Sequence, residues 1–201
     1  MIKYSNGKTY SPKADKAKES PKVKSLKRHL SSANRGMDLE GDINATNEFY
    51  REKDLCIITK RPTPINIVKV DYSKGAIITN AYFEKQSTTD YNGVYKGKYI
   101  DFEAKQTKSK TSFPLANIPE QQIKHLEGVL SHNGIAFFII EFVSKDEVFL
   151  LDAKYVIDFY RNGDRKSIPY EEFLRVGHKI KRGYSPRLDY LPIIDKIYCK
   201  S

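Results

Sequence analysis

The order of apolar and polar positions along the chain predicts a mixed α/β fold. IAFFIIEFV (135–143) is an almost continuous apolar run, which is typical of a strand covered on both faces. EVFLLD (147–152) follows it and is expected to pair with it, and LCIITK (55–60) predicts a further short strand. These runs predict a sheet with one central, buried strand.

Helical spacing marks the segments around these strands. Segment 31–54 predicts a helix, because Leu39, Ile43, Thr46 and Tyr50 recur in it at helical spacing. PEQQIKHLEGVLSHNG (119–134) predicts a helix that its proline opens and its last glycine stops. Further helical segments are expected at 155–160, 170–176 and 191–199.

Two strand-like runs around a Lys-Gly turn predict a β-hairpin. INIVKVDY (65–72) alternates apolar and polar residues, and AIITNAYFEK (76–85) follows the turn. Pro62 and Pro64 lack the N–H that a central strand needs, so the chain before the hairpin cannot continue within a sheet. The hairpin is therefore expected to project from the body.

The stretch TTDYNGVYKGKYIDFEAKQT (88–107) combines an acidic residue, Asp90, with a predicted turn at Asn92-Gly93 and a following strand. Successive side chains of a strand point to opposite faces. One face would carry Asp101, Glu103 and Lys105, and the opposite, apolar face Ile100, Phe102 and Ala104.

Carboxylates in this arrangement suit a hard divalent cation. Magnesium prefers oxygen ligands, usually one or two carboxylates with waters and substrate phosphate, and Asp90 and Glu103 could supply them. Lys105 would lie about 7 Å along the strand from Glu103, where it could hold an attacking water or stabilise charge at phosphorus. A solvated face with a weak ion pair is the simpler interpretation of Glu-x-Lys alone, so the rest of the chain has to decide.

The charge balance favours a polyanionic partner. Lys and Arg total 35 against 25 Asp and Glu, which leaves a net charge of +10. Such a surplus suits nucleic acid because neutralised phosphates release counterions, although ribosomal association or mere basicity gives the same balance. Residues 1–30 are Lys-rich with little apolar periodicity and predict a disordered arm that either contacts DNA or only aids solubility. Arg35, in the first turn of the 31–54 helix, suggests a phosphate partner or a local ion pair.

Other classes are not supported. No apolar run approaches the ~20 residues that span a bilayer, and the first residues lack the apolar core of a signal peptide. The two cysteines and four histidines show neither a disulfide framework nor the spacing of zinc ligands. We therefore expect a cytoplasmic protein without a membrane partner.

Six motifs occur in order along nearly the whole chain: NRGMDLEGDINATN (34–47), RPTPINIVKV (61–70), AYFEKQSTTDYNGVYKGKYIDFEAKQTKSKTSFPL (81–115), QIKH (122–125), RKSI (165–168) and GYSPRLDY (183–190). Together they resemble the RecU family of Holliday junction resolvases, within the PD-(D/E)xK nuclease superfamily. The resemblance implies a restriction-endonuclease-like mixed sheet flanked by helices. It also implies a homodimer that cuts four-way DNA junctions symmetrically with Mg²⁺, or with Mn²⁺ in its place.

The resemblance also implies a site. Its metal ligands would be Thr88, Asp90, Glu103 and Gln122, with Lys105 as the transition-state stabiliser. Gln122 could bring a carbonyl oxygen or orient a metal-bound water. Asp101 stays open between metal ligation and orienting Lys105 or a water.

The hairpin, roughly 60–85, resembles the family's stalk, for which a role in the open centre of the junction is implied. Such a protrusion can discriminate by shape without reading bases. The predicted phosphate contacts are Lys60, Arg61, Lys69 and Lys74. Tyr82 and Phe83 would either stack on exposed bases or pack at the base of the stalk. The predicted plan is an arm (1–30) and a nuclease domain (31–201) that contains this insertion.

Alternative functions and further partners stay open. The basic arm and stalk alone would also suit a non-catalytic factor that aligns junctions or modulates a RecA-type recombinase. A sequence-specific restriction enzyme would share the fold. The resemblance adds a RecA-type recombinase and a branch-migration motor as expected partners.

Overall fold

The structure, a computed structural model, describes residues 39–73, 75–83 and 88–199. The predicted arm over 1–30 lies outside these residues, as do Arg35 and Lys74. No helix in the described ranges is long and apolar enough to cross a membrane.

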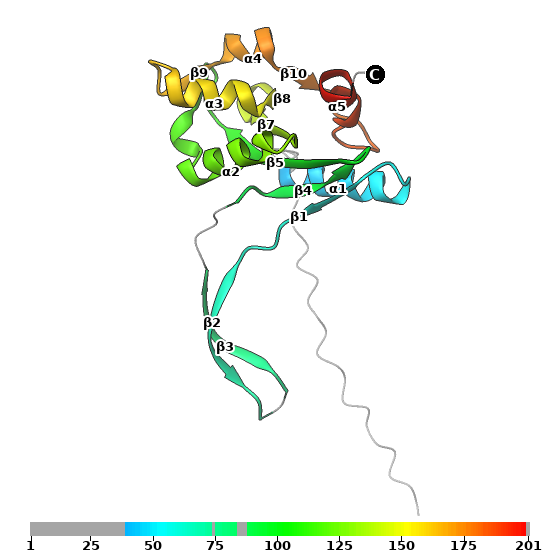
Figure 1. The fold of residues 1–201 in the computed structure, drawn as a ribbon, viewed down its shortest axis with the longest axis vertical. Helices are drawn as coiled ribbons and strands as arrows, with labels where there is room; N and C mark the ends of the chain where they lie inside the picture. Colours follow the sequence, from blue (N-terminus) through cyan, green and yellow to red (C-terminus); the bar gives the residue numbers. More distant parts are fainter. Residues whose placement is uncertain (1–38, 74, 84–87, 200–201) are drawn as a thin grey trace, which may run out of the picture. The chain divides into compact units, whose positions relative to one another are not determined.

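A mixed sheet forms the centre of the fold, with strands in the order β1-β4-β5-β7-β8-β10 (Figure 1). The strands are β1 (Ile57–Lys60), β4 (Tyr91–Tyr95), β5 (Lys98–Thr107), β7 (Ile135–Phe142), β8 (Glu147–Asp152) and β10 (His178–Ile180). β5 and β7 run parallel, whereas the other neighbouring pairs are antiparallel. The predicted pairing of 135–143 with 147–152 is therefore confirmed.

Helices cover both faces of this sheet. They are α1 (Leu39–Glu52), α2 (Glu120–Ser131), α3 (Ala153–Asn162), α4 (Tyr170–Val176) and α5 (Leu191–Tyr198), with short 3-10 turns at Leu115–Asn117 and Val143–Lys145. β7 is buried along its whole length because alternate side chains enter two cores. Phe137 packs with α1 and α5, whereas its neighbour Phe138 packs with α2, α3 and α4. A small two-stranded sheet, β6 (Ser112–Pro114) with β9 (Ser167–Pro169), completes the described body.

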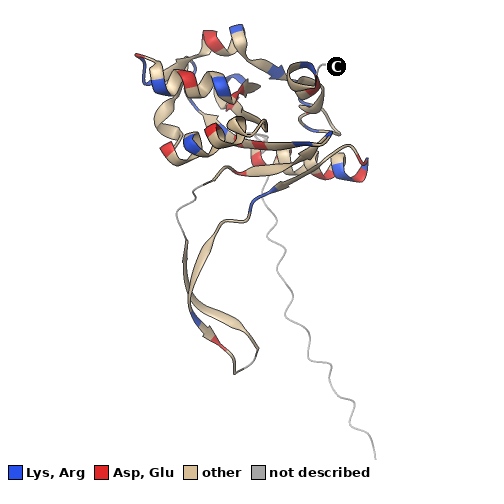
Figure 2. Cartoon of the chain, viewed as in Figure 1, with Lys and Arg blue, Asp and Glu red and all other residues tan. Residues whose placement is uncertain are grey.

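The predicted hairpin is confirmed as a separate sheet. β2 (Ile65–Asp71) and β3 (Ile77–Phe83) pair antiparallel with each other. Every residue of β3 is exposed, and Figure 2 shows both strands largely without charge. In the turn, Gly75 has φ of 106°, a left-handed conformation that favours glycine.

The predicted turn at Asn92-Gly93 is wrong. Both residues lie within β4, and the turn before β5 is at Lys96-Gly97, where φ is positive at both positions. Gly93 instead allows close strand approach, because a Cβ there would lie 2.0 Å from the carbonyl oxygen of Ile57 in β1. The glycine therefore serves sheet pairing and not chain reversal.

Candidate metal and catalytic site

Side chains from three places meet beside β5. Asp90 directly precedes β4, Glu103 and Lys105 lie on β5, and Gln122 lies in the first turn of α2. Lys105 Nζ is 2.6 Å from Glu103 Oε1, and Gln122 Nε2 donates a hydrogen bond to the same oxygen at 2.8 Å. The Asp90 backbone N–H donates to Glu103 Oε2 at 3.0 Å. We call Thr88, Asp90, Glu103, Lys105 and Gln122 the candidate site.

The Asp90 carboxylate also faces β5. Its Oδ2 accepts a hydrogen bond of 3.4 Å from the backbone N–H of Ala104, the residue after Glu103. The predicted apolar reverse face of β5 is confirmed as well, because Ile100, Phe102 and Ala104 pack in the core shared with α1 and α5. Burial on that side fixes the strand and holds the polar side chains on the other.

Glu103 is the electrostatic centre of the candidate site. Its side chain is 1% exposed, and burial raises the pKa of its carboxyl to about 7, with the Lys105 ammonium opposing the rise and the Asp90 charge adding to it. Two neighbouring carboxylates in a buried place are costly without a compensating cation. The arrangement therefore favours a positive ion beyond Lys105.

Gln122 supplies an oxygen that suits such an ion. Its side chain is buried, and among the described residues its amide oxygen Oε1 has no hydrogen-bond partner. Its amide nitrogen Nε2 donates to Glu103 and, at 3.4 Å, to the Thr88 carbonyl. The described ranges contain no group of three or more His, Cys, Asp or Glu placed to hold a metal. Two carboxylates, an amide oxygen and added waters are a donor set that fits magnesium better than a softer metal.

Asp101 lies on the same face of β5 but belongs to another group. Its carboxylate contacts Arg61, Thr89, Tyr99 and His125. Burial opposes its charge, but hydrogen bonds from His125, Arg61, Thr89 and Tyr99 outweigh this and lower its pKa below the usual value. His125 was not singled out from the sequence, although its i,i+3 spacing from Gln122 places both on one face of α2.

The predicted DNA contacts are dispersed. Lys60 forms an ion pair with Glu40, and Arg61 faces Asp101. Lys69 is exposed on β2, and Tyr82 and Phe83 are exposed on β3. Because both rings are exposed, their burial does not support the predicted packing role at the base of the stalk.

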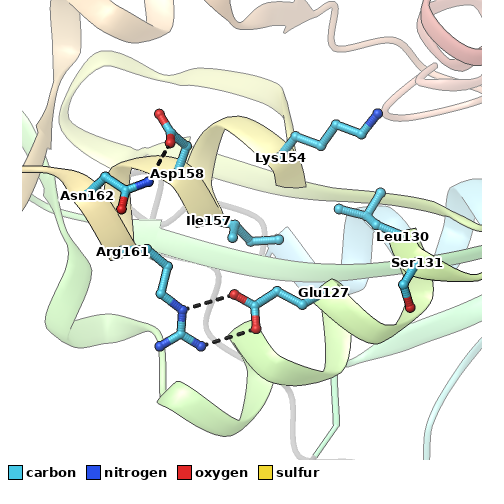
Figure 3. Close-up of a pocket in the computed structure, with 8 residues that line it drawn as sticks. All are labelled: Glu127, Leu130, Ser131, Lys154, Ile157, Asp158, Arg161 and Asn162. Carbon is cyan, nitrogen blue, oxygen red and sulfur yellow. Dashed lines mark hydrogen bonds and ion pairs between the residues drawn. The ribbon is translucent and has the colours of Figure 1, made fainter.

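A surface pocket between α2 and α3 contains none of these residues; Figure 3 shows its bidentate Arg161–Glu127 pair.

A mixed α/β fold that gathers two carboxylates, an amide oxygen and a lysine has the features of a metal-dependent nuclease. The chain belongs to the RecU family: the family model "Recombination protein U" matches residues 34–196. It is 52% identical over 203 positions to the Holliday junction resolvase RecU of Geobacillus sp. (strain WCH70), and 50% identical over 202 positions to those of Geobacillus kaustophilus and Bacillus cereus (strain AH820). Each alignment covers 98% of both chains.

Proposed function

We propose that this chain is a Holliday junction resolvase that cuts four-way DNA junctions by magnesium-dependent phosphodiester hydrolysis in recombination and repair. The observation that carries the proposal is the contact of Asp90, Glu103, Lys105 and Gln122 beside β5. Full-length similarity to proteins named Holliday junction resolvases supports the substrate. Junction DNA as substrate would place the protein in the cytoplasm of a bacterial cell.

Each residue of the candidate site has a proposed role. Asp90, Glu103, the Gln122 amide oxygen and Thr88 would hold Mg²⁺ or Mn²⁺, which when bound acidifies water and offsets charge at phosphorus. Lys105, 21% exposed, reaches from the buried Glu103 toward solvent. Its ammonium can therefore donate to the attacking water or to a phosphate oxygen, where negative charge grows in the transition state.

We propose that the fold is restriction-endonuclease-like, with a nuclease domain over 31–201, a basic DNA-contacting arm over 1–30 and a stalk over 60–85. The stalk would discriminate junctions by shape, with Lys69 meeting phosphate and Tyr82 and Phe83 stacking on unpaired bases. The wide exposure of these two rings supports contact with a partner and not internal packing.

A homodimer follows from the chemistry of symmetric cutting. Two opposed strands of the junction are cut at equivalent positions, which needs two active sites related by a two-fold axis. The hairpin supports self-association. Its strands leave apolar side chains exposed, among them Ile65, Ile67, Val68, Ile77 and Ile78, which is unusual for a surface without a partner. A RecA-type recombinase and a branch-migration motor are the further partners that we propose.

The function is tested with the purified protein, Mg²⁺ and a mobile four-way junction, beside a linear duplex of the same sequence. We expect paired nicks at symmetric positions of the junction and little cutting of the duplex, mapped on denaturing gels. Tight junction binding without incision under any divalent ion would favour the non-catalytic alternative. Site-specific cutting of the duplex would favour a restriction enzyme.

Metal binding is expected to depend on pH. Because burial raises the pKa of Glu103 to about 7, this carboxyl is largely protonated at pH 6 and ionised at pH 8, and it must lose its proton to bind a cation. The affinity for Mn²⁺ should therefore be roughly tenfold weaker at pH 6 than at pH 8, as one proton competes with the ion. Electron paramagnetic resonance of free Mn²⁺, without DNA, measures this. Equal affinity at the two pH values would contradict it.

A further inference from the structure

A second cluster of polar side chains, gathered around the buried Asp101, lies beside the candidate site. We call it the Asp101 cluster, and it consists of Arg61, Thr89, Tyr99, Asp101 and His125. Asp101 has no exposed side-chain surface, although it is only two residues from Glu103 on the same face of β5. Asp101 is thus a fully buried carboxylate close to a site that already contains the carboxylates of Asp90 and Glu103.

Both oxygens of Asp101 are occupied. Oδ1 accepts from the Thr89 hydroxyl and, at 3.4 Å, from Arg61. Oδ2 accepts from Arg61 Nη2 at 2.6 Å and from the Tyr99 hydroxyl at 2.8 Å, and it lies 2.9 Å from His125 Nε2. A carboxylate offers about four lone-pair sites, so these donors leave no free position for a metal ion. Asp101 is therefore not a metal ligand in this arrangement.

The cluster instead holds the backbone that carries Asp90. The Arg61 backbone N–H donates to the Asp90 carbonyl at 2.7 Å, and its guanidinium donates to the Thr89 carbonyl at 3.1 Å and to the Thr89 hydroxyl at 2.6 Å. Residues 88–90 lie outside β4, and the Arg61–Asp90 backbone bond continues the pairing of β1 with β4 by one step. The side chains of the cluster hold Thr89 in addition, and Asp101 keeps Arg61 and Thr89 in place by accepting from both.

The cluster also holds α2. Gln122 contacts Glu103 at 2.8 Å, and one helical turn later His125 contacts Asp101 at 2.9 Å. Two contacts on one face of α2, to two side chains of one strand, fix the rotation of the helix about its axis. That rotation decides where Oε1 of Gln122 points, an atom that has no hydrogen-bond partner in the part of the chain that the structure describes.

We propose that Asp101 is a positioning residue: through Arg61 and Thr89 it fixes the Asp90 segment, and through His125 it fixes Gln122, without binding the ion itself. The proposal rests on the proposed function, because it assigns Asp101 a role toward the same metal site. It replaces the roles left open from the sequence, metal ligation and orienting Lys105 or a water, with a different one. Groups that orient metal ligands typically change metal affinity or activity by roughly 10- to 100-fold when they are mutated.

The test is Asp101→Asn in the full-length protein, with Mn²⁺ as the probe. Asparagine keeps the shape but loses the charge and half of the acceptor capacity. We expect Mn²⁺ affinity without DNA to fall roughly 10- to 100-fold, kcat for junction cleavage to fall with it, and KM for the junction to stay unchanged. Excess Mn²⁺ should restore part of kcat. Wild-type Mn²⁺ affinity in a folded Asp101→Asn protein would overturn the proposal.

Partner variants separate positioning from other roles. His125→Gln and Arg61→Gln should each weaken Mn²⁺ binding several-fold, and combining either with Asp101→Asn should add little, since groups that act as one unit are not additive. Full additivity would contradict the cluster. If Asp101→Asn does not fold, these two single variants carry the test, and wild-type affinity in both would overturn it.

Two controls complete the experiment. Glu127→Gln breaks another guanidinium–carboxylate pair on α2, the Arg161–Glu127 pair at 2.9 Å and 3.1 Å, on the side that faces α3 (Figure 3), and it should change neither Mn²⁺ affinity nor kcat. Asp90→Ala should remove both. Normal cleavage by Asp90→Ala would refute the proposed function. If Asp90→Ala is inactive as expected but Asp101→Asn keeps wild-type Mn²⁺ affinity, only the positioning role is refuted.

Discussion

Replacing Glu103 with glutamine is expected to lower the rate of junction cleavage by about a thousandfold or more, equivalent to about 4 kcal/mol in activation free energy. Glutamine keeps the size of the side chain and can still contact Gln122 and Lys105. It removes the charge that a hard cation requires. Junction binding, measured by gel shift in Ca²⁺, should stay within about twofold, because the Glu103 side chain is buried and its proposed role is toward the metal ion. Undiminished cleavage would refute the assignment of the site.

The same variant should not destabilise the metal-free protein at pH 8. The folded-state pKa of Glu103 is raised to about 7 from an ordinary value of 4.5, so its contribution to stability is fully present below about pH 4.5 and is lost as pH rises through 7. The wild type bears this cost of burying charge at pH 8, and glutamine does not. Thermal denaturation in EDTA should therefore give Glu103→Gln an equal or higher Tm at pH 8. A clearly lower Tm would mean that the contacts of the Glu103 carboxylate with Lys105 and with the Asp90 backbone N–H outweigh the cost of burying its charge.

Replacing Lys105 with methionine is the second large effect. We expect kcat to fall roughly 10²- to 10³-fold with KM and Mn²⁺ affinity little changed, because the ammonium acts on charge that develops only in the transition state. Single-turnover cleavage of the junction at saturating Mg²⁺ measures the chemical step directly.

The chain offers a matched control. Lys179 also pairs with a glutamate, Glu147, at 2.6 Å, but on the β10 edge of the sheet. Lys179→Met should leave kcat unchanged. If Lys105→Met raised KM with an unchanged kcat, the lysine would be a binding residue and not a stabiliser of the transition state.

The sequence pattern was sufficient for the main strands. The buried run of β7, the pairing of β7 with β8, the hairpin and the two faces of β5 all follow from local periodicity, because side-chain direction in a strand is set by the backbone. The common face of Glu103 and Lys105 was predicted in this way. Thr88 and Gln122 entered only by resemblance to a family, since amides and hydroxyls carry no local signal of metal binding.

The local pattern gave a wrong prediction at Gly93, because glycine occurs both in turns and in strands that a neighbouring backbone approaches closely. Asn-Gly is a strong turn signal, yet Gly93 lies in β4 because the backbone of β1 approaches it closely. The presence of β1 at that position depends on the pairing of strands that are separated by the whole hairpin. The residues next to Gly93 in the sequence therefore do not reveal that β1 pairs with β4.

By itself the sequence determined which residues share a face and where most helices and strands lie, since those depend on neighbours within a few positions. Only the tertiary structure decided what each polar side chain meets. It brought Gln122 to Glu103 across 19 positions of sequence and His125 to Asp101 across 24. It filled both oxygens of Asp101, while Oε1 of Gln122 has no hydrogen-bond partner within 39–73, 75–83 and 88–199. Asp101 and Glu103 point the same way from β5 but meet different neighbours. Arg61, Thr89 and His125 converge on Asp101, whereas Gln122 and the Asp90 backbone converge on Glu103, because distant segments of the chain pack beside each carboxylate.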